Sequence, residues 1–275
     1  MMKIKKYLSK EKDIFNKDID KLFFKIKKNT NKLHKAMWYS VNNGGKRLRP
    51  IIIKIISQLL GLKKKQYLSA MLCIELIHCY SLVHDDLPSM DDDDYRRGKL
   101  STHKKFNEAQ AILAGNSLLT MAFEQIANLD NKKLSKILTF LVGAEGLAGG
   151  QSVDLDLNQT KLSKNKILEI HKLKTACLFE FCVSAPFIIN NSTPSKIKMA
   201  KKYGNLFGQI YQIMDDIHDE HEIDSSSINI LSACKKKEAI LLCEKCLEEA
   251  NQLSVKLFPN TEVKINELMH YIINE

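Results

Sequence analysis

Apolar residues recur at helical spacing along almost the whole chain, and this periodicity constrains the fold more than any other feature. The 275 residues include only 11 glycines and five prolines, so long uninterrupted helices are possible. No region shows the sustained alternation of apolar and polar residues, with hairpin turn pairs, that is typical of strands. We therefore predict an all-α protein, a single domain over residues 1–275 built as a bundle of about ten helices.

Cap and turn residues divide this pattern into separate helices. Residues 17–39 read as one amphipathic helix that stops before Gly44 and Gly45, and Pro50 opens the next helix. Residues 66–86 form a long apolar helix. Further helices are expected at 107–129, 133–148, 164–190, 195–220 and 233–257.

The chain lacks the usual marks of a membrane-spanning or secreted protein. No stretch reaches the roughly 18 to 20 apolar residues of a membrane span, and the basic start has no apolar signal core. Seven cysteines, an odd and scattered number, argue against a disulfide framework, and the close pair Cys243 and Cys246 reads as two cysteines on one helix. We expect a cytoplasmic protein without a membrane span.

A net charge of +10 raises the question of nucleic-acid binding. The lysines look like a compositional bias spread over the chain, and no basic stripe interleaved with aromatic residues stands out. We therefore predict no nucleic-acid partner. A small anionic substrate would use the positive field equally well.

Arginine, in contrast to lysine, is confined to two short segments. The chain has 38 lysines but only four arginines, namely Arg47, Arg49, Arg96 and Arg97. The planar fork of arginine binds phosphate oxygens bidentately, which lysine cannot do. The segments 44–50 and 85–99 therefore predict phosphate binding.

A cluster of aspartates shares the second of these segments: Asp85, Asp86, Asp91, Asp92, Asp93 and Asp94. Asp85 and Asp86 come at the C-terminal end of an apolar helix, where the helix dipole is unfavourable for carboxylates. Divalent cations with oxygen ligands relieve this repulsion, and Mg2+ commonly bridges one or two carboxylates to substrate phosphates. The segment predicts a magnesium site beside a diphosphate.

A second acidic cluster occurs in residues 211–219. On a helix, Asp215 and Asp219 lie one turn apart on one face, and Gln212 precedes Asp215 by three residues. The flanking residues are apolar, so a solvated acidic face explains the cluster poorly. Together with a separate basic pair, Lys46 and Arg49, the sequence offers two metal-binding clusters and two anion sites.

Five segments occur in the order found in trans-polyprenyl diphosphate synthases: GGKRLRP at 44–50, DDLPSMDDDDYRRG at 85–98, GGQSVDLD at 149–156, KLKT at 172–175 and YQIMDDIHD at 211–219. Over residues 35–220 the chain resembles this family, and most of all its bacterial farnesyl diphosphate synthase branch. The resemblance implies an isoprenoid synthase fold with a deep central cavity, a homodimer and three Mg2+ ions. It implies condensation of isopentenyl diphosphate with dimethylallyl or geranyl diphosphate to farnesyl diphosphate, through metal-assisted ionisation, carbocation attack and proton loss.

The resemblance also implies roles for single residues, carried over by position. The implied metal ligands are Asp85 and Asp91 with Asp86 in support, and Asp215 with Asp216 and Asp219 nearby. The implied isopentenyl diphosphate site consists of Lys46, Arg49, His78 and Arg97. The implied allylic diphosphate site consists of Arg96, Lys174, Thr175 and Gln212. The last three would also face the cation, and with Asp85, Asp91 and Asp215 they make up the implied catalytic set. Without the resemblance, His78 reads as a core histidine.

Tyr80 is a candidate for setting product length. It precedes Asp85 by five residues, which places it about 7 Å away along a helix. A growing chain running along that helix would meet the ring, and the resemblance agrees that a bulky residue there limits products to fifteen carbons. The alternative is a plain core tyrosine.

The chain departs from the family after Asp219. The loop there is shortened, and the family's loop lysines have no clear counterpart; the nearest are Lys235, Lys236 and Lys237. We expect a mobile segment at 221–232, weak allylic binding and turnover lowered by about ten- to a hundredfold, the effect of one missing charged hydrogen bond. The main alternative is a non-catalytic or impaired member that binds diphosphates or serves as a partner subunit; a metal-dependent hydrolase or a terpene cyclase is a further alternative.

Overall fold

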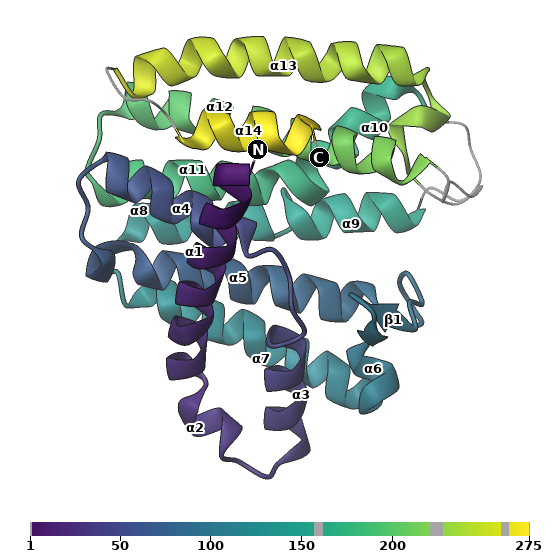
Figure 1. Ribbon diagram of the computed structural model, residues 1–275. Helices are drawn as coiled ribbons and strands as arrows, with labels where there is room; N and C mark the ends of the chain where they lie inside the picture. Colours follow the sequence, from purple (N-terminus) through teal and green to yellow (C-terminus); the bar gives the residue numbers. More distant parts are fainter. Residues whose placement is uncertain (1, 157–161, 221–227, 260–263, 275) are drawn as a thin grey trace. The chain divides into compact units, whose positions relative to one another are not determined.

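The computed structural model describes residues 2–156, 162–220, 228–259 and 264–274. Within these ranges the protein is helical apart from one small hairpin (Figure 1). The prediction of an all-α protein is confirmed. The described residues form fourteen α-helical segments rather than ten, and two of them, α2 and α6, are only four residues long.

The chain divides into two compact units. The first unit comprises residues 2–54 and 64–131, and the second comprises residues 55–63 and 132–275. Each unit is described by itself, and the single domain with a deep central cavity stays a prediction.

The first unit contains α1 (Met2–Leu22), α2 (Phe24–Lys27), α3 (Lys32–Val41), the start of α4 (Leu48–Leu59), α5 (Lys64–Asp85), β1 (Tyr95–Arg96), β2 (Lys99–Leu100), α6 (Thr102–Lys105) and α7 (Glu108–Ala127). Helices α5 and α7 run side by side (Figure 1). Gly115 of α7 permits this close packing, because a Cβ atom there would lie 2.2 Å from Nε2 of His84 on α5. The contact holds the C-terminal end of α5, where the first aspartates lie, against α7.

Helix α5 passes the length and composition test for a membrane span. However, 61% of its most apolar window is buried inside the protein, as expected for a core helix. Twelve of its residues are buried, on all sides of the helix.

The single helix expected at residues 17–39 is wrong. The chain breaks after α2, and Asn31 caps α3 by accepting a hydrogen bond from the Leu33 backbone N–H at 2.8 Å. Asn29 accepts another from the Asn31 backbone N–H at 2.9 Å. Asparagine side chains offer the backbone these local alternatives to a helix, and two of them here outweigh the apolar periodicity.

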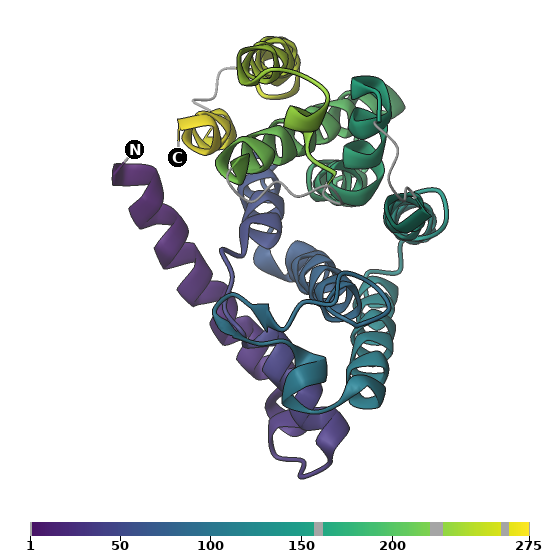
Figure 2. The ribbon, with the colours of Figure 1, turned by 90° about the vertical axis from the view of Figure 1, so that its right-hand side faces the viewer.

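The second unit contains α8 (Lys132–Val142), α9 (Leu147–Asp156), α10 (Lys164–His171), the π-helix η1 (Lys172–Ala176), α11 (Cys177–Ile189), α12 (Pro194–His218), the 3-10 helix η3 (Ile230–Ser232), α13 (Lys236–Leu257) and α14 (Lys264–Asn274). Helix α12 packs against α11, η1 and α13 (Figure 2). Glycines let it approach closely, because a Cβ atom on Gly208 would lie 2.4 Å from the Ala176 Cα. The second acidic cluster is thereby fixed beside η1.

Candidate active site

A β-hairpin positions the two arginines of the first acidic segment. Tyr95 pairs with Leu100 and Arg96 with Lys99, so Arg97 and Gly98 form the two-residue turn. Both turn residues have positive φ, 56° and 74°, as a type I′ turn requires. The sequence pattern missed this hairpin because strands of two residues have no periodicity to detect. As a result, Arg96 lies in strand β1 and Arg97 in the turn, and the two side chains meet different partners.

Arg96 binds carboxylates of its own segment. Its Nε donates to Asp86 Oδ1 at 2.7 Å and its Nη2 to Asp93 Oδ2 at 2.6 Å. Asp86 is only 2% exposed, and this burial raises its pKa, while the hydrogen bond from Arg96 opposes the rise. Arg96 thus stabilises the charged form of a buried aspartate beside Asp85.

Asp85 and Asp91 come together through the backbone. The Asp91 N–H donates to the Asp85 carbonyl oxygen at 2.8 Å, which folds the loop after α5 back onto the helix end. Asp85 is half-buried and Asp91 is exposed, whereas Asp86 points inward. The two residues implied as metal ligands are therefore accessible to solvent, whereas Asp86 is buried.

Arg97 meets His78 of α5. Its Nη2 lies 3.4 Å from His78 Nε2, and its Nη1 donates to the Gly44 carbonyl oxygen at 2.8 Å. Burial, and then the guanidinium groups of Arg49 and Arg97, lower the pKa of His78 well below its ordinary value. The neutral imidazole can therefore accept from Arg97 through Nε2. The structure thus brings together His78, Arg49 and Arg97, three of the four residues predicted for isopentenyl diphosphate. The fourth, Lys46, is exposed three residues before Arg49.

Gly45 is required where Arg97 crosses the 44–50 segment. A Cβ atom on Gly45 would lie 2.6 Å from Arg97 Nη1, and the backbone there has φ of 109°. Only glycine accommodates both the conformation and the contact.

Arg47 does not serve the phosphate role suggested by the confinement of arginine to two segments. It is 5% exposed, and it donates to Glu75 Oε1 at 2.5 Å, to the Val41 carbonyl at 2.6 Å and to Asn16 Oδ1 at 3.1 Å. These bonds join the segment to α1, α3 and α5, so Arg47 holds the loop that carries Lys46 and Arg49. No local pattern indicated this role, because Glu75 lies 28 residues away along the chain.

Three further side chains of the first unit lie close enough to hold a cation. Single ligand atoms of Asp92, Asp94 and His103 lie within 4.8 Å of one another. Asp94 is already paired with Lys104 at 2.6 Å. This group was not predicted, because His103 follows Asp94 only after the hairpin has reversed the chain.

In the second unit, α12 sorts its acidic cluster by face. Asp215 and Asp219 are exposed, one turn apart, whereas Asp216 is 4% exposed. Asp216 accepts from Gln212 Nε2 at 2.9 Å and from the Ile230 backbone N–H at 2.6 Å. Burial raises the pKa of Asp216 to about 6, against the effect of both bonds.

Asp216 belongs to a network that the sequence did not reveal. Asn229 donates to the Asp216 carbonyl oxygen at 2.9 Å, and Nε2 of buried His171 lies 3.4 Å from Asp216 Oδ2. Burial lowers the pKa of His171 to about 4, so the imidazole is neutral. The network ties the segment after α12 back onto α12 and α10.

The π-helix η1 presents Lys174 and Thr175. A π-turn inside a helix is rare and frequently occurs at functional sites. Thr175 donates to Gln212 Oε1 at 2.7 Å, so two predicted residues are brought together. Lys174 forms an ion pair with Asp154 of α9. Gly150 lets α9 approach η1, because a Cβ there would lie 2.7 Å from the Lys174 backbone nitrogen.

Tyr80 packs edge-on against His84, with ring centroids 5.5 Å apart. Nε2 of His84 in turn lies 3.2 Å from the Ile112 carbonyl oxygen of α7. The ring is thus held firmly on α5, five residues before Asp85. Its role in product length stays a prediction.

The shortened loop is described only in part. Residues 221–227 of the predicted mobile segment lie outside the described residues. Residues 228–232 are ordered around η3 and bonded to Asp216, which does not agree with mobility there. Among the three loop lysines, Lys236 binds Glu220 at 2.5 Å.

Comparisons with known proteins show which family the chain belongs to. The family model described as polyprenyl synthetase matches residues 30–228. A farnesyl diphosphate synthase of Micrococcus luteus is 38% identical over 217 residues, 77% of this chain and 75% of the relative. That of Bacillus subtilis is 40% identical over 195 residues, which cover 68% of this chain and 66% of the relative.

Solved structures extend the likeness over nearly the whole chain. An FPP/GFPP synthase of Zymomonas mobilis matches with a TM-score of 0.87 and 30% identity, covering 97% of this chain and 99% of that one. A geranyltranstransferase of Thermotoga maritima matches with a TM-score of 0.84 and 28% identity, covering 98% and 100%.

Proposed function

Because the chain belongs to the polyprenyl synthetase family, we propose that it is a prenyltransferase that condenses isopentenyl diphosphate with dimethylallyl or geranyl diphosphate to farnesyl diphosphate. The observation that carries the proposal is the folding of residues 85–97, which presents Asp85 and Asp91 together beside two arginines. The named relatives are synthases, so the comparisons give no support to the non-catalytic alternative.

Magnesium fits the side chains of both acidic clusters. Asp85 with Asp91, and Asp215 with Asp219, offer carboxylate oxygens at the C-terminal ends of α5 and α12, where the helix dipole favours a cation. We propose that these four aspartates hold Mg2+, three ions in all, and that Asp86 and Asp216 act from the interior. When bound, the metal neutralises the diphosphate and so improves it as a leaving group.

The first unit is proposed to bind isopentenyl diphosphate. Arg49, Arg97 and Lys46 supply positive charge, and neutral His78 orients Arg97 through Nε2. Gly45 supports this arrangement by leaving room for the Arg97 guanidinium. Arg96 is bonded to Asp86 and Asp93 through Nε and Nη2, and it is proposed to reach the allylic diphosphate with its Nη1 donors.

The second unit is proposed to bind and stabilise the allylic partner. Lys174 supplies a cation near the diphosphate, and the Thr175 and Gln212 oxygens face the carbocation that its departure leaves. The double bond of isopentenyl diphosphate attacks this carbocation to form the new carbon–carbon bond. Loss of a proton, accepted by the departed diphosphate, restores the double bond and completes the reaction.

The remaining properties are proposed from the family. We propose a homodimer that works in the cytoplasm, with no nucleic-acid partner in its reaction. We also propose that the enzyme is slow, because the shortened loop has no clear counterpart of the family's lysines, and Lys236, one of the nearest, is paired with Glu220.

Ligand binding tests the proposal without turnover. A non-reactive thiolo analogue of geranyl diphosphate, at a hundred times its dissociation constant, should stabilise the protein by about 2.7 kcal/mol. The stabilisation should require Mg2+ and vanish with a chelator, as read from the thermal unfolding midpoint. Equal stabilisation with and without Mg2+ would contradict the metal-bridged diphosphate.

Product length is expected to change with Tyr80. Tyr80→Ala should lengthen products beyond fifteen carbons, because the ring held by His84 would no longer stop the chain. Chromatography of the dephosphorylated products measures this. Tyr80→Phe serves as the control and should keep fifteen carbons; an unchanged distribution in Tyr80→Ala would leave Tyr80 as a core residue.

A further inference from the structure

The positive charge of this protein is concentrated at its N-terminus. Residues 1–35 contain twelve lysines and four carboxylates, a net charge of +8 out of +10 for the whole chain. Lysines do occur along the whole chain, but outside residues 1–35 they are nearly balanced by carboxylates, so the net charge is not evenly spread. Something other than composition distinguishes this segment.

Two of the four carboxylates of α1, Glu11 and Asp18, are buried, whereas Asp13 and Asp20 are exposed. Glu11 is 7% exposed and binds Lys54, and Asp18 is also 7% exposed and binds Lys64 at 2.6 Å. Both partners belong to later helices of the same unit. These pairs neutralise the two buried carboxylates of α1.

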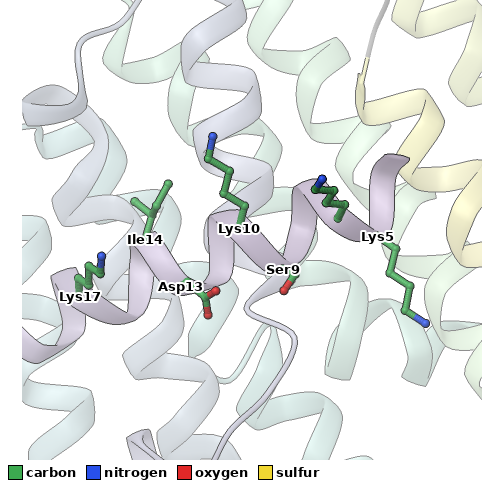
Figure 3. Close-up of a pocket in the computed structure, with 7 residues that line it drawn as sticks. Lys5, Ser9, Lys10, Asp13, Ile14 and Lys17 are labelled. Carbon is green, nitrogen blue, oxygen red and sulfur yellow. The ribbon is translucent and has the colours of Figure 1, made fainter. Parts of the chain in front are cut away.

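On the exposed surface of α1, six lysines face only two carboxylates, Asp13 and Asp20, and Asp20 is already paired with Lys27 at 2.7 Å. Five of these lysines form a straight stripe along the helix. At 100° per residue they lie within about 60° around the helix and span about 27 Å along it. They are Lys3, Lys6, Lys10, Lys17 and Lys21. We call them the α1 lysine stripe. Asp13 is exposed near its edge, and in Figure 3 its side chain diverges from that of Lys10.

The stripe is open to solvent within the described part of the chain. An open hollow borders it, and every residue that lines the hollow belongs to α1 (Figure 3). The apolar side of α1 is already used internally, since Phe15 and Ile19 are 1% and 4% exposed. A partner would therefore meet charge, and α1 would not need to leave the fold.

An exposed aromatic residue lies beyond the end of the stripe. Phe24 of α2 is 57% exposed, with Lys28 Nζ 4.0 Å from its ring centroid. Lysines surrounding an exposed aromatic ring are a combination suited to the interface of a lipid bilayer.

We propose that the α1 lysine stripe docks this protein on the surface of a membrane that contains anionic lipids. Collinear lysines match a plane of negative headgroups, to which each ammonium contributes separately. Nucleic acid is a poorer partner, because residues 1–46 contain no arginine for bidentate phosphate contacts. The docking is electrostatic adsorption and not insertion, since the apolar face of α1 stays buried.

This inference goes beyond the proposed function. Docking would place the enzyme at the membrane surface, into which a fifteen-carbon diphosphate partitions. This consequence rests on the proposed function. The docking itself requires no turnover, so its test stands even if the chain makes no product.

The test is co-sedimentation with vesicles of phosphatidylcholine alone or mixed with phosphatidylglycerol. The full chain should bind the mixed vesicles only, and lose binding between about 0.1 M and 0.5 M salt as the charges are screened. Each lysine should contribute about fivefold to the partition coefficient. Changing Lys3, Lys6, Lys10 and Lys17 to Gln should therefore reduce partition by at least about a hundredfold.

A matched variant separates the stripe from net charge. It changes the exposed residues Lys132, Lys133, Lys136 and Lys198 to Gln, which removes the same charge from elsewhere. Partition of this variant should fall less than about fivefold, as for exposed charges that do not belong to the docking stripe. Equal losses in both variants, or equal binding to neutral vesicles, would overturn the proposal.

Two further readouts complete the test. Trp38 is the single tryptophan, and it packs against Phe23, the residue that follows α1. Its fluorescence emission should be unchanged in both variants if they fold. A duplex oligonucleotide should compete weakly with vesicles at equal salt. Tight stripe-dependent binding of the duplex without vesicle binding would assign the stripe to nucleic acid and contradict the membrane.

Discussion

Replacing Asp85 by asparagine is expected to lower turnover by about a thousandfold or more, roughly 4 kcal/mol in transition-state stabilisation. Asp85 ends α5, and its carbonyl oxygen accepts a hydrogen bond from the Asp91 backbone N–H, so the two residues proposed to hold Mg2+ are close along the backbone. The amide keeps the shape of the side chain but removes the charge. Steady-state kinetics at saturating Mg2+ measures the effect.

The control for this prediction lies outside both acidic clusters. Asp20→Asn removes an exposed charge paired with Lys27 and should change turnover less than about threefold, as for a surface pair of little energetic weight. Near-normal turnover of Asp85→Asn would contradict the metal assignment. Comparable losses in both variants would show that the removal of any surface charge, and not specifically the loss of a metal ligand, lowers turnover.

Substitutions of the neighbours Asp215 and Asp216 are expected to affect different properties, turnover for Asp215 and stability for Asp216. Asp215 is exposed, so Asp215→Asn should lower turnover by about a thousandfold. Its free energy of unfolding should stay equal or rise by about 0.5 kcal/mol, because a negative charge leaves the C-terminal end of α12.

Asp216→Asn should instead lower the free energy of unfolding by about 2 kcal/mol. The buried carboxylate accepts hydrogen bonds from both the Gln212 amide and the Ile230 backbone N–H. An asparagine amide has only one oxygen, so its NH2 group would have to face one of these two donors. Urea denaturation of both variants, beside their kinetics, separates the two roles. Equal loss of stability in the two variants would contradict the division of α12 into an exposed ligand face and an internal one.

The sequence predicted those features of the fold that the local pattern of residues determines. Helical periodicity with few glycines and prolines gave the all-α class, and Thr193 and Pro194 start α12 close to the expected boundary. Asp215 and Asp219 share a face because helix geometry alone decides it. The family resemblance, carried by five ordered segments, is confirmed by the family model and by the relatives.

What the sequence could not predict depends on contacts between distant segments. Nothing local distinguishes buried Arg47 from Arg49, since the difference is made by Glu75 on another helix. The same holds for Asp216, whose partner Ile230 follows a loop, and for His171 beside it. The α1 lysine stripe was overlooked because its carboxylates, Glu11 and Asp18, are neutralised by lysines far along the chain.

The central claim is that this chain joins isoprenoid diphosphates with the help of Mg2+, and product analysis tests it most directly. Purified protein is incubated with labelled isopentenyl diphosphate and geranyl diphosphate, with Mg2+ or with a chelator, and the extracted products are sized. The account predicts slow but sustained formation of a fifteen-carbon product that stops when Mg2+ is removed. A folded protein that makes no elongated product with Mg2+ present, or that makes it equally well with the chelator, would contradict the account.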